Sequence, residues 1–289
     1  MQFHLDTAEI FVPDGLPVAP ALARTTHMAI SAHQDDIEIM AVAPILECFQ
    51  REDRWFTGVV VTDGRGSPRD DIYKDFTDED MHVVRFKEQK KAAVVGEYAA
   101  QVLLDFPSRA VKDGANRQPV EDLAALLKAA RPTYVYTHNL ADKHDTHVAV
   151  AVKVIQAIRS LPAEDRPAKL FGCEVWRDLD WLLDVDKVPF NLSTHESLQA
   201  ALLGVFDSQI AGGKRYDLAS MGRRKANATY FESHGTDTTQ GMSFGIDLTP
   251  LVQDDTRDIA SFIQEYITRF AQDVAARLER AGARAVQAG

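Results

Sequence analysis

Short apolar runs alternate with longer amphipathic segments along most of the chain. The runs His27–Ala32 and Trp55–Thr62 are typical of strands buried on both faces of a sheet. Further strands are predicted at 101–106, 133–137 and 169–176, and helical spacing is predicted at 36–49, 82–98, 120–130 and 146–158. This alternation predicts an α/β fold: a Rossmann-like three-layer domain with a mostly parallel central sheet and helices on both faces.

The two ends of the chain differ from this alternating region. Residues 1–26 contain Pro13, Gly15, Pro17 and Pro20, which predicts an irregular lead-in. Residues 255–280 predict a long amphipathic helix that stops near Gly282 and packs on the domain or on a second subunit. The Ser-x-x-Glu form of residues 193–196 predicts a capping box that opens another helix. We find no linker and no internal repeat, so a single domain over 1–289 is predicted.

Composition and charge narrow the function classes. Apolar residues make up 45% of the 289 residues and charged ones 26%, which is ordinary for a globular protein. The net charge of −11 argues against nucleic-acid binding, which normally uses a basic face. Cys48 and Cys173 both lie in apolar contexts and are predicted to be buried thiols. Without a signal-peptide pattern or a run long enough to span a membrane, the protein is expected to be cytoplasmic.

Two clusters of polar residues follow two of the predicted strands. The first is Ala32-His33-Gln34-Asp35-Asp36-Ile37-Glu38, and the second is His144-Asp145-Thr146-His147. In open α/β sheets ligands bind at the carboxyl ends of the strands, where both clusters lie. Two imidazoles and one carboxylate around an open position form a catalytic zinc pattern. We therefore assign His33, Asp36 and His147 as metal ligands with a water in the remaining position.

Asp35 and His144, which also lie in the two clusters, are the candidate catalytic residues. Metal coordination brings the pKa of water from about 15.7 toward roughly 7, and Asp35 is then the candidate general base. His144 is expected to stabilise the oxyanion or to protonate the leaving amine. Each cluster alone has an ordinary explanation: an Asp pair often caps a helix, and His-x-x-His is often a solvated face. Their joint occurrence after two separate strands favours a metal site.

These motifs resemble those of the PIG-L (LmbE-like) family of zinc-dependent de-N-acetylases. The family's Ala-His-Pro-Asp-Asp and His-Pro-Asp-His motifs correspond to residues 32–36 and 144–147. Its Thr-x-Gly-x-Gly loop resembles residues 62–66, and its Arg-x-x-Glu helix start resembles Arg85 to Glu88. A weaker match places Ser208-Gln209 at a family Ser-Gln, and the resemblance covers roughly residues 27–210. It implies the same zinc ligands, Asp35 as base, His144 as the charged group beside the tetrahedral intermediate and Arg85 as a cation that anchors the substrate.

Several positions depart from the family pattern. Gln34 replaces a proline, Thr146 stands where the family has the Asp that orients the first histidine, and Phe206 replaces a histidine. Asp145 is a candidate to take over the orienting role. Arg65 replaces a glutamate in the glycine loop, where it is a candidate substrate-binding residue, although a solvated loop arginine is an equal alternative. These changes suggest a substrate other than a simple N-acetylglucosaminide.

The sequence therefore predicts a metal-dependent amide hydrolase that removes an N-acetyl or other N-acyl group from a small molecule containing an amino sugar. The alternatives are a deacylase of a secondary-metabolite or antibiotic intermediate, and a non-catalytic relative that binds a small molecule with a vestigial metal site. Zn²⁺ is the expected cofactor, although Fe²⁺ also suits two histidines and one carboxylate. The expected partner is an N-acetylated small molecule, with no nucleic acid and no membrane span. A homo-oligomer is possible because of the long terminal helix.

Overall fold

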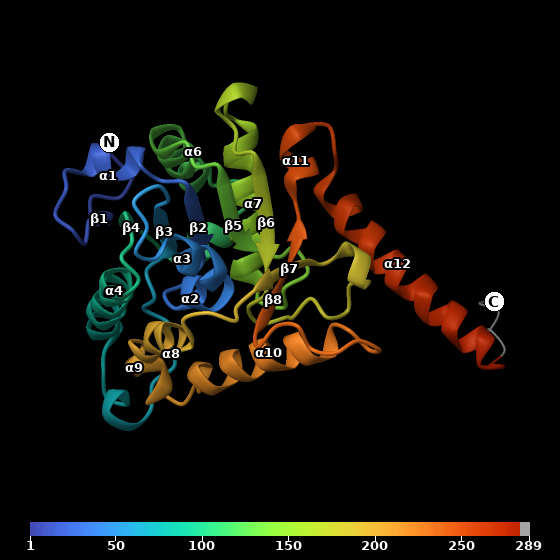
Figure 1. Ribbon diagram of the computed structural model, residues 1–289. Coiled ribbons are helices and arrows are strands. Elements are labelled where there is room, and N and C mark those ends of the chain that lie inside the picture. Colours follow the sequence, from blue (N-terminus) through green and yellow to red (C-terminus); the bar gives the residue numbers. More distant parts are fainter. Residues whose placement is uncertain (284–289) are drawn as a thin grey trace.

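The computed structural model describes residues 1–283, and its centre is one twisted sheet (Figure 1). The strand order is β1-β4-β3-β2-β5-β6-β8-β7. The five strands from β4 to β6 in this order run parallel, whereas β1 and β8 are antiparallel to their neighbours. The bounds are β1 (Glu9–Phe11), β2 (His27–Ser31), β3 (Phe56–Thr62), β4 (Ala100–Phe106), β5 (Tyr134–His138), β6 (Lys169–Cys173), β7 (Val188–Asn191) and β8 (Met242–Asp247). The predicted mostly parallel α/β sheet is confirmed.

Helices cover both faces of the sheet and complete the predicted three layers. One face is covered mainly by α1 (Val18–Ala23), α5 (Ser108–Lys112), α6 (Gln118–Ala130), α7 (Asp145–Arg159) and α11 (Thr249–Gln253). The other face carries α2 (Asp36–Met40), α3 (Val42–Cys48), α4 (Asp78–Val95) and α8 (Glu196–Gly204). The remaining helices are α9 (Asp207–Ile210), α10 (Tyr216–Tyr230) and α12 (Ile259–Arg280).

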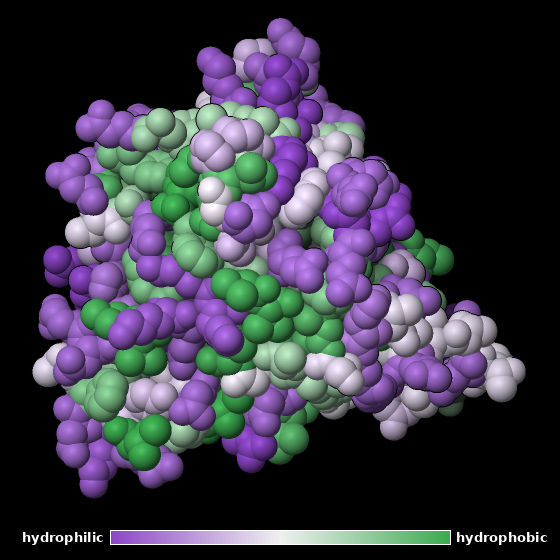
Figure 2. Space-filling view, turned by 60° about the vertical axis from the view of Figure 1, so that its left-hand side comes forward, coloured by the Kyte–Doolittle hydropathy of each residue, from purple (hydrophilic) through white to green (hydrophobic). Residues whose placement is uncertain are grey.

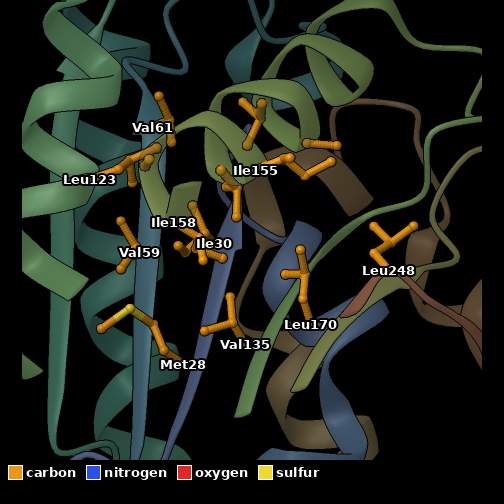
Figure 3. Packing of buried hydrophobic residues seen from close by; sticks show 14 of the residues in the cluster. Met28, Ile30, Val59, Val61, Leu123, Val135, Ile155, Ile158, Leu170 and Leu248 are labelled. Atoms are coloured by element: carbon orange, nitrogen blue, oxygen red, sulfur yellow. The ribbon is translucent and has the colours of Figure 1, made fainter. Parts of the chain in front are cut away.

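The strand side chains divide between two hydrophobic layers because successive residues of a strand point to opposite faces. Met28 and Ile30 of β2 pack with Leu123 of α6 and Ile155 of α7 in the larger layer (Figure 3). Ala29, between them in sequence, packs in the layer beneath α2, α3 and α4. Both faces of the central strands are therefore apolar, which explains the continuous apolar runs in the sequence. Cys48 and Cys173 are both buried and free, as predicted.

The structure corrects three local predictions. The lead-in 1–26 is not wholly irregular, because β1 pairs with the edge of β4 and α1 packs Leu22 into the core. The helix expected over 36–49 is divided at Ala41 into α2 and α3, since Pro44 has no N–H to donate to the carbonyl of Met40. The capping box expected at 193–196 is absent: His195 is the N-cap of α8, and the Ser193 hydroxyl instead accepts from the Gln240 N–H.

The C-terminal helix begins four residues later than predicted and extends away from the sheet (Figure 1). Asp258 caps it by accepting a 2.7 Å hydrogen bond from the Ser261 N–H. Its first turns pack on the domain through buried Phe262 and Ile263, and Gly282 follows its end with a φ of 85°. Among the described residues, no helix is both long and apolar enough to cross a membrane. On the face seen in Figure 2, hydrophilic residues surround patches of hydrophobic ones.

The strand order creates the crevice that holds the candidate site. From β2 the chain proceeds to β3 on one side, whereas from β5 it proceeds to β6 on the other side. The loops that leave β2 and β5 therefore diverge, and a crevice opens between them at the carboxyl edge of the sheet. The two polar clusters of the sequence follow these two strands directly.

Candidate active site

The three predicted metal ligands converge in this crevice. His33 Nδ1 lies 3.2 Å from His147 Nε2, and each of these nitrogens lies 3.3 Å from Asp36 Oδ2. Three donors with bonds of about 2.0–2.2 Å around a tetrahedral ion stand roughly 3.3–3.5 Å apart. The separation, the donor types and the burial of Asp36 and His147 therefore fit a divalent cation such as zinc.

The turn after β2 fixes the first two donors. Asp36 Oδ2 accepts a 2.8 Å hydrogen bond from the backbone N–H of His33, which closes the turn between these residues. Burial would raise the pKa of Asp36, but His147 and His33 hold it well below its ordinary value, so this carboxylate is charged. The intervening Asp35 has a φ of 77°, a left-handed conformation that is costly for a residue with a side chain.

Asp35 is held by a buried network rather than by the metal ligands. Its Oδ2 accepts a 2.8 Å hydrogen bond from Arg85, whose guanidinium also donates to the Gln34 carbonyl. Glu88 lies 3.3 Å from Arg85 and accepts from the Ser208 hydroxyl and N–H at 2.6 and 2.7 Å. Burial outweighs the attraction of Arg85 and raises the pKa of Asp35 to about 7. A carboxyl group with this pKa can both accept and return a proton near neutral pH.

This network gives Arg85 a positioning role. Its side chain is fully buried against two carboxylates, and it borders the cavity beside Asp35. Its positive charge therefore positions Asp35, and the substrate-anchoring role that the resemblance implied stays a prediction. Glu88 also joins the segments around residues 85 and 208, because it accepts a hydrogen bond from the Ser208 N–H.

The ligand His147 is supported from behind by a second carboxylate. Asp142 Oδ2 lies 3.4 Å from His147 Nδ1, an arrangement that orients a metal-binding imidazole. Burial lowers the pKa of His147, but Asp36 and Asp142 outweigh this effect and raise it to about 9. The ring of His138 stacks on His147 with centroids 3.9 Å apart, and its Nε2 accepts from the Ala32 N–H at 2.8 Å. His138 thus supports the site from beneath.

His144 lies beside the donor triad without joining it. Its ring stacks on His147 at 4.5 Å between centroids and meets the edge of His33 at 5.0 Å. Burial and these two imidazoles lower its pKa, which keeps the ring neutral at pH 7, whereas the resemblance implied a charged group at this position. Asp145 is exposed, so it does not take over the orienting role considered for it, and His144 Nδ1 has no hydrogen-bond partner among the described residues.

Arg65 does not reach the cavity. Its guanidinium lies 3.2 Å from Asp63 and 3.4 Å from Asp105, so nearby carboxylates neutralise its charge. Gly64 and Gly66 on either side of it do line the cavity. The placement of Arg65 gives no support to the predicted substrate contact, because its guanidinium already pairs with Asp63 of the same loop and with Asp105 at the end of β4.

Two adjoining cavities lie over the triad. The larger has a volume of about 370 Å³ and the smaller about 250 Å³, and they share Asp35, Asp36, Trp176 and Tyr216 as lining residues. Trp176 follows β6 at the same edge of the sheet, and its place at the end of the predicted strand 169–176 could have indicated this position. Tyr216 comes from the start of α10, and no sequence pattern indicated that this residue lies near the triad.

Comparison with known proteins agrees with this geometry. Residues 28–158 match the PIG-L family model, described as GlcNAc-PI de-N-acetylase. No sequence among curated proteins matches the chain significantly.

Three solved structures illustrate the similarity in fold. The conserved protein TT1542 from Thermus thermophilus is 18% identical, with a TM-score of 0.59, over 75% of this chain and 93% of that one. GalB, the 4-carboxy-2-hydroxymuconate hydratase from Pseudomonas putida, is 14% identical, with a TM-score of 0.58, over 78% of this chain and 96% of that one. The N,N'-diacetylchitobiose deacetylase from Pyrococcus horikoshii is 14% identical, with a TM-score of 0.53, over 76% of this chain and 83% of that one. At these identities the structures share the fold alone, and the family match carries the functional information. Both motifs converge at the crevice, and both lie within residues 28–158, the region that matches the PIG-L family model.

Proposed function

We propose that this protein is a metal-dependent amide hydrolase that removes an N-acetyl or related N-acyl group from a small molecule containing an amino sugar. The match of residues 28–158 to the PIG-L family model supports an N-deacetylase. The observation that carries the proposal is the triad of donor atoms 3.2–3.3 Å apart beside a buried carboxyl group, Asp35, with a pKa of about 7. The fold alone does not decide the reaction, since one structure that shares it is a hydratase.

His33, Asp36 and His147 would hold the metal ion. When bound, a divalent ion supplies a Lewis acid that polarises a carbonyl and lowers the pKa of water. Two imidazoles and a carboxylate suit both zinc and iron(II), and we favour zinc because the resemblance to the family implies it.

The side chains around the triad supply proton transfer and charge stabilisation. Asp35 accepts the proton of the attacking water, and its pKa near 7 allows it to return that proton to the departing amine. Arg85 fixes the orientation of Asp35 through a 2.8 Å hydrogen bond. The neutral His144 donates its ring N–H to the acyl oxygen as negative charge develops there.

A deacylase of a secondary metabolite remains the second candidate within the same reaction class. It is favoured by Thr146, which replaces the family's aspartate, and by the shared wall of Trp176 and Tyr216 over the triad. Acetate release from a panel of N-acetyl sugars and N-acetylated glycosides distinguishes the two candidates.

The first test compares two variants that separate chemistry from metal binding. Asp35→Asn removes the proton acceptor and is expected to lower kcat by about 10²–10⁴-fold while the zinc content stays near that of the wild type. His147→Ala removes a ligand and is expected to lose both zinc and turnover. Zinc is measured by elemental analysis and acetate release by a coupled assay. Asp145→Asn, an exposed change of the same charge, serves as the control.

Near-normal turnover of Asp35→Asn would contradict the assigned mechanism. A wild-type protein that binds no metal and releases no acetate from any member of the panel would instead favour a small-molecule-binding relative with a vestigial site.

A further inference from the structure

Most of the charged side chains that line the two cavities are basic. Apart from Asp35 and Asp36, which belong to the site already described, each charged residue in the lining is basic. These basic residues are Arg85, Lys112, Lys143, Lys214 and Arg223. The whole chain has 43 acidic residues and 32 lysines and arginines, so this basic lining is opposite to the net charge of the protein.

Four of these cations have no acidic partner. Arg85 is neutralised by Asp35 and Glu88, but within the described part of the chain no carboxylate lies within 4.0 Å of the charged nitrogens of Lys112, Lys143, Lys214 or Arg223. Some lysines elsewhere on the protein are paired with carboxylates, with examples at 2.7 Å (Lys90–Glu9), 2.9 Å (Lys169–Asp247) and 2.8 Å (Lys187–Asp184). The cavity therefore concentrates positive charge that the protein itself does not neutralise.

An aromatic wall places two of these ammonium groups next to the triad. The Nζ atoms of Lys143 and Lys214 lie 5.8 and 5.0 Å from the centroid of the Trp176 ring, within the range of cation–π attraction. The backbone N–H of Trp176 donates to Asp142 Oδ2 at 3.2 Å, and the same oxygen supports His147. The two lysines are thus tied through Trp176 to the residue that orients a metal ligand.

Arg223 completes the positive region on the other side of this wall. It lines the smaller cavity together with Lys143, Val175 and Trp176, and its guanidinium donates to the Val175 carbonyl. A guanidinium and two ammonium groups offer the donor geometry by which phosphate and carboxylate groups are recognised.

We propose that the substrate carries an anionic group, a phosphate or a carboxylate, which Lys143, Lys214 and Arg223 bind next to the amide that is hydrolysed. This inference rests on the proposed function, because it assumes that the acyl group lies over the triad. It narrows the substrate class from amino sugars in general to acidic derivatives of them. The residues that select the substrate are then carried by the loop before α7, the segment after β6 and the region around α10.

The test compares neutral and acidic substrates with the zinc-loaded enzyme. Acetate release is measured from N-acetylglucosamine, N-acetylglucosamine 6-phosphate and the carboxylate-bearing N-acetylmuramic acid. At least one acidic sugar is expected to have a kcat/KM about tenfold or more above that of the neutral sugar, mainly through KM. This preference should fall with rising salt, because the cations are partly exposed. The acidic sugar that shows the larger preference distinguishes a phosphate from a carboxylate as the recognised group.

Charge-removing variants identify the residues responsible. Lys143→Gln and Lys214→Gln are each expected to lower the ratio of acidic to neutral kcat/KM by about threefold to tenfold. Lys128→Gln, an exposed change on α6 outside the cavity, is the matched control and should leave this ratio unchanged. Equal kcat/KM values for neutral and acidic sugars, or a ratio insensitive to both cavity variants, would overturn the proposal.

A binding measurement separates this inference from the proposed reaction. Titration calorimetry with glucosamine 6-phosphate, with muramic acid and with glucosamine reports anion recognition without turnover. If the enzyme releases no acetate but binds the phosphorylated amine more tightly, and Lys143→Gln weakens that binding, the hydrolase proposal fails and the anion site stands. If neither glucosamine 6-phosphate nor muramic acid, the carboxylate-bearing amine, binds more tightly than glucosamine, the anion site is refuted whatever the turnover.

Discussion

Asp142 offers a sharp test of the metal site because it contacts no metal itself. Its Oδ2 lies 3.4 Å from His147 Nδ1 and accepts from the Trp176 N–H at 3.2 Å, while its Oδ1 accepts from the His144 N–H at 3.1 Å. Asp142→Asn keeps the volume of the side chain but replaces one acceptor oxygen by an NH₂ group. In either orientation of the Asn amide, its NH₂ group faces a backbone N–H donor: that of Trp176 in one orientation and that of His144 in the other.

The expected cost follows from these contacts. Asp142→Asn removes the negative charge that holds the His147 ring with Nε2 directed at the other two ligands, so the ring becomes less basic and less well oriented. Loss of such a supporting carboxylate typically weakens metal binding by about 10–100-fold, or ~1.4–2.7 kcal/mol. Asp145→Asn changes the same charge only three residues away, but its side chain is exposed.

The assay is competition for Zn²⁺ against a chromogenic chelator, with wild type, Asp142→Asn and Asp145→Asn measured at one pH and salt concentration. Thermal unfolding of the metal-free proteins shows whether Asp142→Asn remains folded. The reasoning is refuted if a folded Asp142→Asn protein binds zinc within twofold of Asp145→Asn.

Two further predictions concern the framework around the site. Gly64 has a φ of 70°, and an added Cβ would lie 2.3 Å from Gln34 Oε1, so Gly64→Ala is expected to lower the free energy of unfolding by about 1–3 kcal/mol in urea. Gly66→Ala meets open space and should change it by less than ~0.5 kcal/mol; equal costs would contradict this account. Burial raises the pKa of Glu174 above its ordinary 4.5, although backbone N–H groups of Leu179 and Phe244 donate to it. Wild type should therefore lose stability relative to Glu174→Gln as the pH rises from 4.5 through the raised pKa, and a gain would refute the assignment.

The sequence was sufficient to predict the metal triad for a topological reason. His33 and Asp36 follow β2 within a few residues, and His147 lies in the first turn of the helix after β5. Parallel strands place their carboxyl ends at one edge, so neighbouring strands bring such residues together without any long-range information. The structure places these donors as the motifs indicated, and their role in binding metal stays a prediction.

Other contacts depend on segments that carry no such local signal. Arg65 stands in a glycine loop that indicated a substrate contact, but Asp105 at the end of β4 binds it. The partnership of Glu88 with Ser208 spans 120 residues and follows from tertiary packing alone. β7 and β8 were not predicted, because their short runs follow a stretch without clear periodicity.

The position of Trp176, Lys214, Tyr216 and Arg223 along the chain has a consequence for how specificity can diversify. The family match ends at residue 158, whereas these four side chains of the cavity wall all come later. The metal-ligand candidates and these four side chains thus come from separate stretches of the chain, and Lys143 is the exception in the proposed anion site because it lies within the matched region. Exchanging residues 174–224 between two proteins of this kind would therefore transfer much of the substrate preference and leave the metal-ligand candidates unchanged.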